Sequence, residues 1–164
     1  MYDSGHGVQQ DYDEAVKWYK KAAEQNYADA QARLGLMYIY GGGVAIDYSE
    51  AKKWIMKSAE QGSTLGQCRL GSMYESGEEG VEQNYGEAVK WYRKSAEQGY
   101  GRSQFALGYM YQSGYGVQQN YDEAISWYRK SVEQGDEYGQ YNLGYMYHNG
   151  GGSKKLCRSV KIVS

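Results

Sequence analysis

The stretch NYGEAVKWYRKSAEQG at residues 84–99 occurs in four versions along the chain, and this recurrence decides the fold. The other versions are DYDEAVKWYKKAAEQN at 11–26, DYSEAKKWIMKSAEQG at 47–62 and NYDEAISWYRKSVEQG at 120–135. Their tryptophans, Trp18, Trp54, Trp91 and Trp127, are therefore 36, 37 and 36 residues apart. A period of this length is typical of helical repeat proteins, in which each unit buries its apolar face on its neighbours.

Each version has the pattern of an amphipathic helix with marked ends. In the first, one helical stripe contains Ala15, Trp18, Tyr19, Ala22 and Ala23. An Asx residue stands three positions before a glutamate in every copy, as in Asp47 and Glu50. This spacing predicts a capping box, in which the cap accepts a backbone N–H and the glutamate returns a bond. We expect the helices to stop at Asn26, Gly62, Gly99 and Gly135, and the tryptophans to pack in the core.

A second, alanine-rich helical pattern ends in LG-x-MY, as in GRSQFALGYMYQS at 101–113. A glycine-rich loop such as SGYGVQQ at 113–119 joins the two patterns. Because this loop follows a helix and recurs, it favours a hinge over a phosphate-binding loop, with Gly114 ending a helix, Gly116 turning and Val117 packing. No strand-like alternation is present. The chain is predicted to be all-α, a right-handed α/α solenoid of antiparallel helix pairs with about seven helices.

The recurring unit A-x-x-x-x-x-LG-x-MY-x-x-G-x-GV-x-x-[DN]-Y-x-EA-x-x-WY-x-K-[AS]-A-EQG resembles the Sel-one-like repeat, a branch of the tetratricopeptide-type helical repeats. The resemblance covers 1–149, although the proline that often follows GV in this family is absent. It divides the chain into a half-unit at 3–27, units at 28–63, 64–100 and 101–136, and a last helix at 137–149. We interpret Met1 and Tyr2 as the end of a preceding helix. The basic tail at 150–164 is predicted to be loosely packed or, alternatively, to cap the last helix through Leu156, Val160 and Ile162.

Composition narrows the range of functions. Leu, Ile, Val and Phe make up only 22 of 164 residues, a fraction that is typical of disordered chains when the net charge is high. Here the net charge is only −2, and 20 Tyr and 4 Trp are present. We therefore expect a folded chain whose core is built largely from aromatic rings. The mildly acidic balance argues against a nucleic-acid partner. No apolar run is long enough to span a bilayer, and no signal peptide is apparent, so we expect no membrane insertion and a cytoplasmic location by default.

Residues for catalysis are scarce. The only histidines, His6 and His148, lie in different units, and Cys68 and Cys157 have unrelated contexts. We therefore predict no enzyme activity, no catalytic residues, no metal and no cofactor. One alternative is a hydrolase or β-lactam-binding activity as in cysteine-rich relatives, but those carry cysteine pairs at the repeat spacing. Another is an RNA-binding helical repeat, which the acidic balance opposes.

The resemblance implies that the first helix of each pair lines a concave surface. Counting from Ala28, Thr64, Gly101 and Glu137, the second, fifth, ninth and twelfth positions vary and share one helical face. Toward the C-terminal end this face becomes aromatic, which favours protein contact. The predicted partner-binding residues are Arg102, Phe105, Tyr109, Gln112, Tyr138, Tyr141, Tyr145 and His148. We predict a non-enzymatic interaction scaffold that holds a peptide or protein segment, with a possible end-to-end homodimer. Alternatively, the last tyrosines meet a missing unit.

Overall fold

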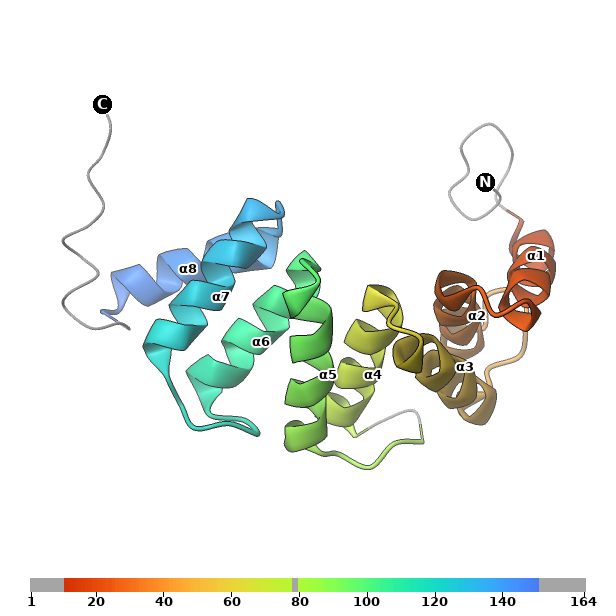
Figure 1. Ribbon diagram of the computed structural model, residues 1–164, viewed down its shortest axis with the longest axis horizontal. Coiled ribbons are helices and arrows are strands. Elements are labelled where there is room, and N and C mark those ends of the chain that lie inside the picture. The colour runs from red at the N-terminus through yellow and green to blue at the C-terminus, as the bar shows by residue number, and fades with distance from the viewer. Residues whose placement is uncertain (1–10, 78–79, 151–164) are drawn as a thin grey trace.

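The computed structural model describes residues 11–77 and 80–150, which form eight α-helices and no strand. The helices are α1 (Tyr12–Glu24), α2 (Ala28–Tyr40), α3 (Tyr48–Glu60), α4 (Thr64–Ser76), α5 (Tyr85–Glu97), α6 (Gly101–Ser113), α7 (Tyr121–Glu133) and α8 (Glu137–His148). They follow one another in a single curved row, with α1 and α8 at opposite ends (Figure 1). The all-α solenoid is confirmed. The predicted helix count of about seven was one short, because the half-unit, three helix pairs and last helix supply eight.

Two of the predictions concern the ends of the chain. The helix end at Met1 and Tyr2, and the alternatives of a loose tail or a cap formed by Leu156, Val160 and Ile162, lie outside the described residues.

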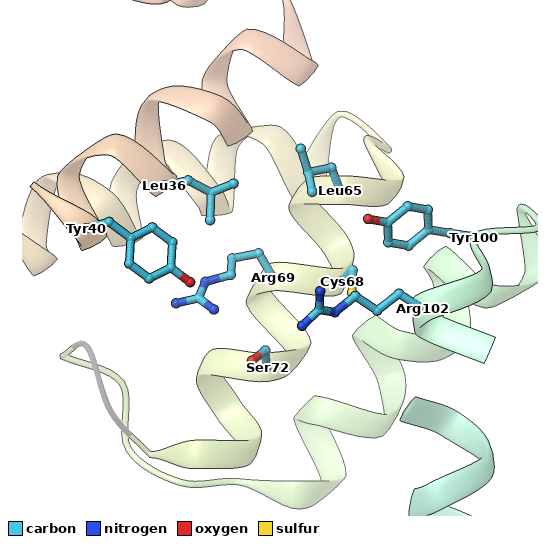
Figure 2. Close-up of a pocket in the computed structure, with 8 residues that line it drawn as sticks. All are labelled: Leu36, Tyr40, Leu65, Cys68, Arg69, Ser72, Tyr100 and Arg102. Atoms are coloured by element: carbon cyan, nitrogen blue, oxygen red, sulfur yellow. The ribbon is translucent and has the colours of Figure 1, made fainter. Parts of the chain in front are cut away.

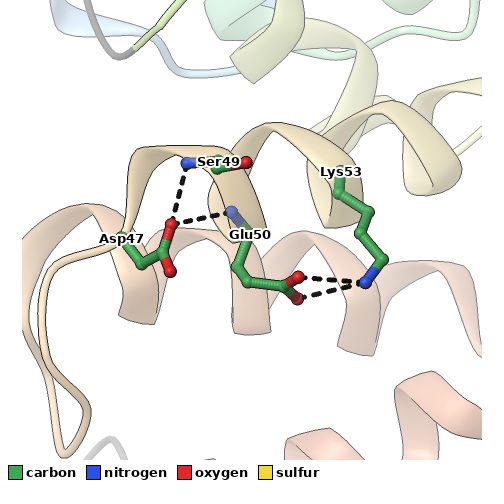
Figure 3. A network of polar contacts seen from close by, with 4 residues as sticks. All are labelled: Asp47, Ser49, Glu50 and Lys53. Atoms are coloured by element: carbon green, nitrogen blue, oxygen red, sulfur yellow. Dashed lines mark hydrogen bonds and ion pairs between the residues drawn. The ribbon is translucent and has the colours of Figure 1, made fainter.

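The N-cap of α3 shows how each second helix of a pair begins (Figure 3). The Asp47 carboxylate accepts hydrogen bonds from the backbone N–H groups of Ser49 and Glu50, both at 3.0 Å. The predicted return bond from Glu50 was wrong, because the Asp47 N–H donates instead to the Tyr38 carbonyl of α2 at 3.0 Å. Glu50 is thereby left to accept from the Lys53 ammonium group at 3.0 Å. The same tertiary bond joins Asn84 to Tyr74 and Asn120 to Tyr111.

Left-handed residues end the helices where the sequence predicted. Asn26, Gly62, Gly99 and Gly135 have φ values of 63°, 91°, 89° and 81°. The hinge at 113–119 is also confirmed, since Gly114 caps α6 with φ 74° and Gly116 turns the loop with φ 69°. A Cβ atom at Gly116 would collide with the Tyr85 carbonyl group, so the loop can approach α5 closely only with glycine there. Val117 packs against the buried core.

The LG glycines make room for large side chains of the following helix. A Cβ atom at Gly108 of α6 would lie 2.8 Å from the Tyr128 ring of α7, and Gly71 of α4 faces Tyr92 of α5 in the same way. Gly35 of α2 faces Ile55 of α3. These contacts bring paired helices together, and Tyr128 is fully buried. The equivalent glycine of α8, Gly144, faces open space, since a Cβ atom there would have no described neighbour within 4 Å.

Three of the four tryptophans pack as expected, but the first does not. Trp127 and Trp54 are buried, and Trp91 is half-buried beside the core. Trp18 is 50% exposed. Trp54 shares a core cluster with Leu34 of its own helix pair and with Val16 of the preceding half-unit, whereas no helix in the described part of the chain precedes α1. Trp54, Trp91 and Trp127 therefore each join their unit to the unit before it.

Buried glutamines add polar contacts between units. Gln31 of α2 donates to the Ala23 carbonyl at 3.1 Å and accepts from the Gln61 side-chain amide at 2.6 Å. Gln67 repeats the arrangement one unit later, with the Ala59 carbonyl and the Gln98 amide. Because a buried amide is costly unless it is paired, these bonds favour one register between neighbouring units.

Candidate partner-binding site

The first helices of the pairs, α2, α4 and α6, share one surface, which with α8 we call the inner surface. Helix α2 packs directly on α4, and a pocket of about 190 Å³ opens across all three helices (Figure 2). The pocket is lined by Leu36, Tyr40, Leu65, Cys68, Arg69, Ser72, Tyr100 and Arg102. The inner surface therefore contains at least one cavity built from three consecutive units.

Of the four positions predicted to face a partner, two are partly used by packing. The fifth and twelfth positions of α2, Ala32 and Ile39, are buried. At the twelfth position of α4, Glu75 accepts a hydrogen bond from the Tyr92 hydroxyl at 2.6 Å, and Gln112 of α6 does so from Tyr128 at the same distance. Variation at these two positions therefore has a packing role, whereas the second and ninth positions are more open.

In α6 the predicted residues lie in three environments. Arg102 is exposed and lines the pocket, while Phe105 is half-buried between the rings of Tyr128 and Tyr138, with centroids 5.9 and 5.6 Å away. The ring of Tyr109 meets that of Tyr115 edge-on at 6.1 Å, and Tyr115 stacks on Tyr85 at 4.8 Å. Tyr109 is thus an exposed ring that packs against Tyr115 on one side.

In α8 the predicted residues are more exposed. Tyr138, Tyr141 and Tyr145 are 64%, 74% and 51% exposed, and His148 is exposed as well. Tyr145 also lines a cavity of about 330 Å³ together with Gln112. The structure thus brings together Phe105 with Tyr138 and Gln112 with Tyr145, but it puts Arg102 in a separate pocket.

Arg69, Tyr40 and Tyr100 line the pocket but were missing from the predicted site. The guanidinium group of Arg69 lies over the Tyr40 ring, 5.6 Å from its centroid. Arg69 is at the sixth position of its helix, which also varies between units and lies one turn beyond the second position. Adding the sixth position to the predicted face would have found it.

Comparison with known proteins places this repeat in a family. The model of the Sel1 repeat matches residues 1–27, 28–63, 64–100, 101–136 and 137–156. The chain belongs to the Sel1 repeat family. The resemblance based on the recurring motif is therefore confirmed, and Sel1 repeats are commonly protein-interaction scaffolds.

Solved structures of Sel1 repeat proteins are similar to this chain. A protective antigen of uropathogenic Escherichia coli is 47% identical, with a TM-score of 0.81 over 93% of this chain and 32% of the antigen. A Sel1 repeat protein from Oxalobacter formigenes is 41% identical, with a TM-score of 0.83 over 92% of this chain and 61% of that protein. The cysteine-rich protein B of Helicobacter pylori is 25% identical, with a TM-score of 0.64 over 85% of this chain and all of that protein. No curated protein sequence matches.

Burial dominates the chemistry of the pocket floor in this Sel1 array. It raises the pKa of the Cys68 thiol above its ordinary value, although a hydrogen bond with Ser103 and the charges of Arg102 and Arg69 act in the opposite direction. Burial likewise raises the pKa of the Tyr100 hydroxyl. Both groups are therefore protonated at neutral pH, and the charged side chains that line the pocket are Arg69 and Arg102.

The described residues contain neither a metal-site cluster nor a membrane-spanning helix. Nowhere in 11–77 and 80–150 do three or more His, Cys, Asp or Glu side chains gather as a metal site would require. Within the same residues, every helix is too short or too polar to cross a bilayer.

Proposed function

We propose that this Sel1 array is a non-enzymatic scaffold that binds a peptide or protein segment along its inner surface, without a nucleic-acid partner. The strongest contacts are expected at the C-terminal end, from Phe105 and Tyr109 to Tyr145. Tyrosine rings suit this role because they offer a large contact area with few rotatable bonds and a polar tip.

The observation that carries the proposal is the cluster of exposed rings on α6 and α8. Tyr138, Tyr141 and Tyr145 are each more than half exposed, and Tyr109 lies on the neighbouring helix of the same surface. The recurring motif does not require any of these four rings. A group of exposed aromatic side chains on one face is typical of an interaction site.

A selection with a random dodecapeptide library displayed on phage tests the proposal, with the purified chain as bait. Selected peptides are then synthesised and their affinities are measured by fluorescence anisotropy. We expect Tyr141→Ala combined with Tyr145→Ala to weaken binding at least tenfold while the far-ultraviolet circular dichroism stays unchanged. Tyr48→Ala, which removes a 44% exposed ring from the first turn of α3, is the matched control and should bind as the wild type does.

Two outcomes would refute the scaffold proposal. One is a selection that enriches no peptide above an empty surface. The other is a folded Tyr141/Tyr145 double variant with undiminished affinity for every selected peptide.

We also propose that α8 can accept a second copy of the chain, end to end. The Gly144 slot is open, whereas the equivalent slots are filled by Ile55, Tyr92 and Tyr128 of the following helix. Helix α1 has Tyr19 at the equivalent position and a half-exposed Trp18 beside it, so it has the side chains to pack in this slot. Such a contact joins two different faces and would extend the array. A sedimentation profile that stays monomeric up to high protein concentration would refute self-association.

A further inference from the structure

Helices α8 and α1 are the two halves of a helix pair. Each first helix, α2, α4 and α6, is followed by a second helix that packs on it, but within the described part of the chain no helix follows α8 and none precedes α1. The two helices lie at opposite ends of the row (Figure 1). We infer that α1 of one copy docks on α8 of another in the register of an internal pair, so that the two ends form one complete repeat unit. This inference rests on the proposed self-association and names the contacts that fix its register.

Apolar side chains at both ends are more exposed than their internal equivalents. Leu143 of α8 is partly buried, whereas the equivalent leucines are at most 1% exposed, namely Leu34, Leu70 and Leu107. Trp18 of α1 is 50% exposed, whereas Trp54 and Trp127 are at most 9% exposed. Docking of the two ends would remove this apolar surface from water, which is the main favourable term in association.

The side chains at the two ends also match in polarity. In each internal pair, the twelfth residue of the first helix is matched to the residue after the tryptophan of the second helix: Ile39 to Ile55, Glu75 to Tyr92 and Gln112 to Tyr128. In both polar pairs the tyrosine hydroxyl donates a hydrogen bond at 2.6 Å. The ends follow the same rule, because α8 has the polar His148 at its twelfth position and α1 has Tyr19 after its tryptophan. Across the junction, the Tyr19 hydroxyl would donate to the His148 imidazole, which has an acceptor nitrogen when it is neutral.

Further polar groups fix the register along the helix axis. Two internal pairs are joined by a glutamine hydrogen bond, from Gln61 to Gln31 at 2.6 Å and from Gln98 to Gln67 at 2.8 Å. The equivalent glutamines at the ends, Gln25 after α1 and Gln140 of α8, are both exposed. The Asp11 backbone N–H likewise corresponds to the N-cap donors of the internal pairs, and the Tyr147 carbonyl corresponds to their acceptors. A slip of one residue along a helix would misplace all of these groups together, so they favour a single register.

One bond of the internal pairs is missing at the ends. Serine hydroxyls of the second helices donate to the first-residue carbonyls of the first helices at 2.7, 2.9 and 3.0 Å, from Ser58, Ser95 and Ser131. Helix α1 has Ala22 at this position, so it cannot donate to the Glu137 carbonyl of another copy. Two copies also have no connecting loop to keep the two helices near each other. The junction is therefore weaker than an internal pair, and association depends on protein concentration.

Sedimentation equilibrium over a range of protein concentrations tests the junction. We expect the average mass of wild type to rise beyond that of a dimer, because a contact between two different faces does not close. Ala22→Ser should tighten association about fivefold, since it supplies the missing hydrogen bond. Gly144→Ala should weaken association about tenfold or more, because a Cβ atom at the three equivalent glycines would lie 2.6, 2.7 and 2.8 Å from a side chain of the following helix. Asn142→Ala, which alters the opposite side of α8, is the matched control and should associate as wild type does.

A disulfide between copies reports the register. Both proteins in the mixture carry Cys157→Ser, and one has Gly144→Cys while the other has Tyr19→Cys. A Cβ atom at Gly71 would lie 3.1 Å from the Cγ atom of Tyr92, so the two Cβ atoms at this place in a pair are near the roughly 3.5–4.5 Å that a disulfide needs. We expect mild oxidation of the mixture to give a covalent dimer.

The other outcomes separate this junction from the proposals on which it rests. Lys17→Cys, on an exposed side of α1, is the matched control for Tyr19→Cys and should form no disulfide with Gly144→Cys. Equal disulfide yields from the two, no disulfide from Tyr19→Cys, or association that Gly144→Ala leaves unchanged would overturn the register and leave self-association standing. Association that stops at a dimer would overturn the junction, and a wild type that stays monomeric would overturn self-association with it, while peptide binding would stand in both cases. If hydrogen exchange protects 137–148 together with 151–164 in the monomer, the chain's own C-terminal residues cover α8 and the assignment to a second copy is wrong.

Discussion

The packing of Gly108 against Tyr128 predicts that alanine at this position destabilises the fold, although alanine is the better helix former. A Cβ atom would lie 2.8 Å from two carbons of the Tyr128 ring and 3.2 Å from the Ala124 carbonyl oxygen. The ring cannot move aside easily, because it is fully buried and its hydroxyl donates to Gln112 at 2.6 Å. Overpacking of this kind costs about 1–3 kcal/mol.

Gly144 provides the matched control, because it occupies the same position of the repeat but has open space around it. Gly→Ala in a helix interior adds about 1 kcal/mol of stability. Gly144→Ala should therefore raise the free energy of unfolding by up to about 1 kcal/mol, while Gly108→Ala should lower it by up to about 2 kcal/mol.

The measurement is urea unfolding of both variants and wild type at low protein concentration, followed by circular dichroism and by fluorescence. Coincident transitions from the two probes would show that the array unfolds as one unit, which is needed before free energies are compared. Equal stabilisation by the two substitutions would refute the reasoning, because it would mean that the Gly108 slot is not tightly filled.

Three further predictions follow from local contacts. Asn120→Ala removes the N-cap of α7 and should lower the free energy of unfolding by about 1 kcal/mol, measured by urea unfolding. In a double-mutant cycle, Gln112→Leu and Tyr128→Phe should show a coupling of about 1 kcal/mol, because both remove the same hydrogen bond, and additive effects would contradict this. Because burial raises the pKa of the Cys68 thiol above 9.0, its contribution to stability is complete below pH 9 and is lost as pH rises further. Two proteins are compared, both carrying Cys157→Ser, and one of them also carries Cys68→Ala. As pH rises above 9, the urea concentration at the unfolding midpoint should fall less in the protein with Cys68→Ala.

The sequence predicts the fold well because four copies repeat the same signals. The N-caps, the left-handed helix ends and the hinge at Gly114 and Gly116 are local features that depend on residues close in the chain. The missed features all depend on contacts between helices. The Tyr38 carbonyl competes with Glu50 for the Asp47 N–H, and the pairing of Gln31 with Gln61 needs the relative placement of two helices, which no single helix pattern contains.

The candidate site was less predictable, since variation between repeats has two different causes. The residue directly after the repeat tryptophan changes together with the twelfth position. The unit with Ile39 has Ile55 there, whereas the unit with Glu75 has Tyr92, whose hydroxyl donates a hydrogen bond to Glu75. This position therefore varies together with its packing partner. A pattern of variation alone cannot distinguish such matching from adaptation to a ligand.

The distinction changes which residues should be mutated first. Positions whose side chains are bonded to the next helix, such as Gln112, will alter stability and binding together when substituted. Arg102 and Tyr109, at the second and ninth positions, are exposed on the inner surface and hold no hydrogen bond that joins two described helices. Arg69, at the sixth position, is half-buried and lies over the Tyr40 ring, so its substitution will also alter packing. Substitutions at Arg102 and Tyr109 should lower stability little, which makes these two positions the better probes of the proposed scaffold function.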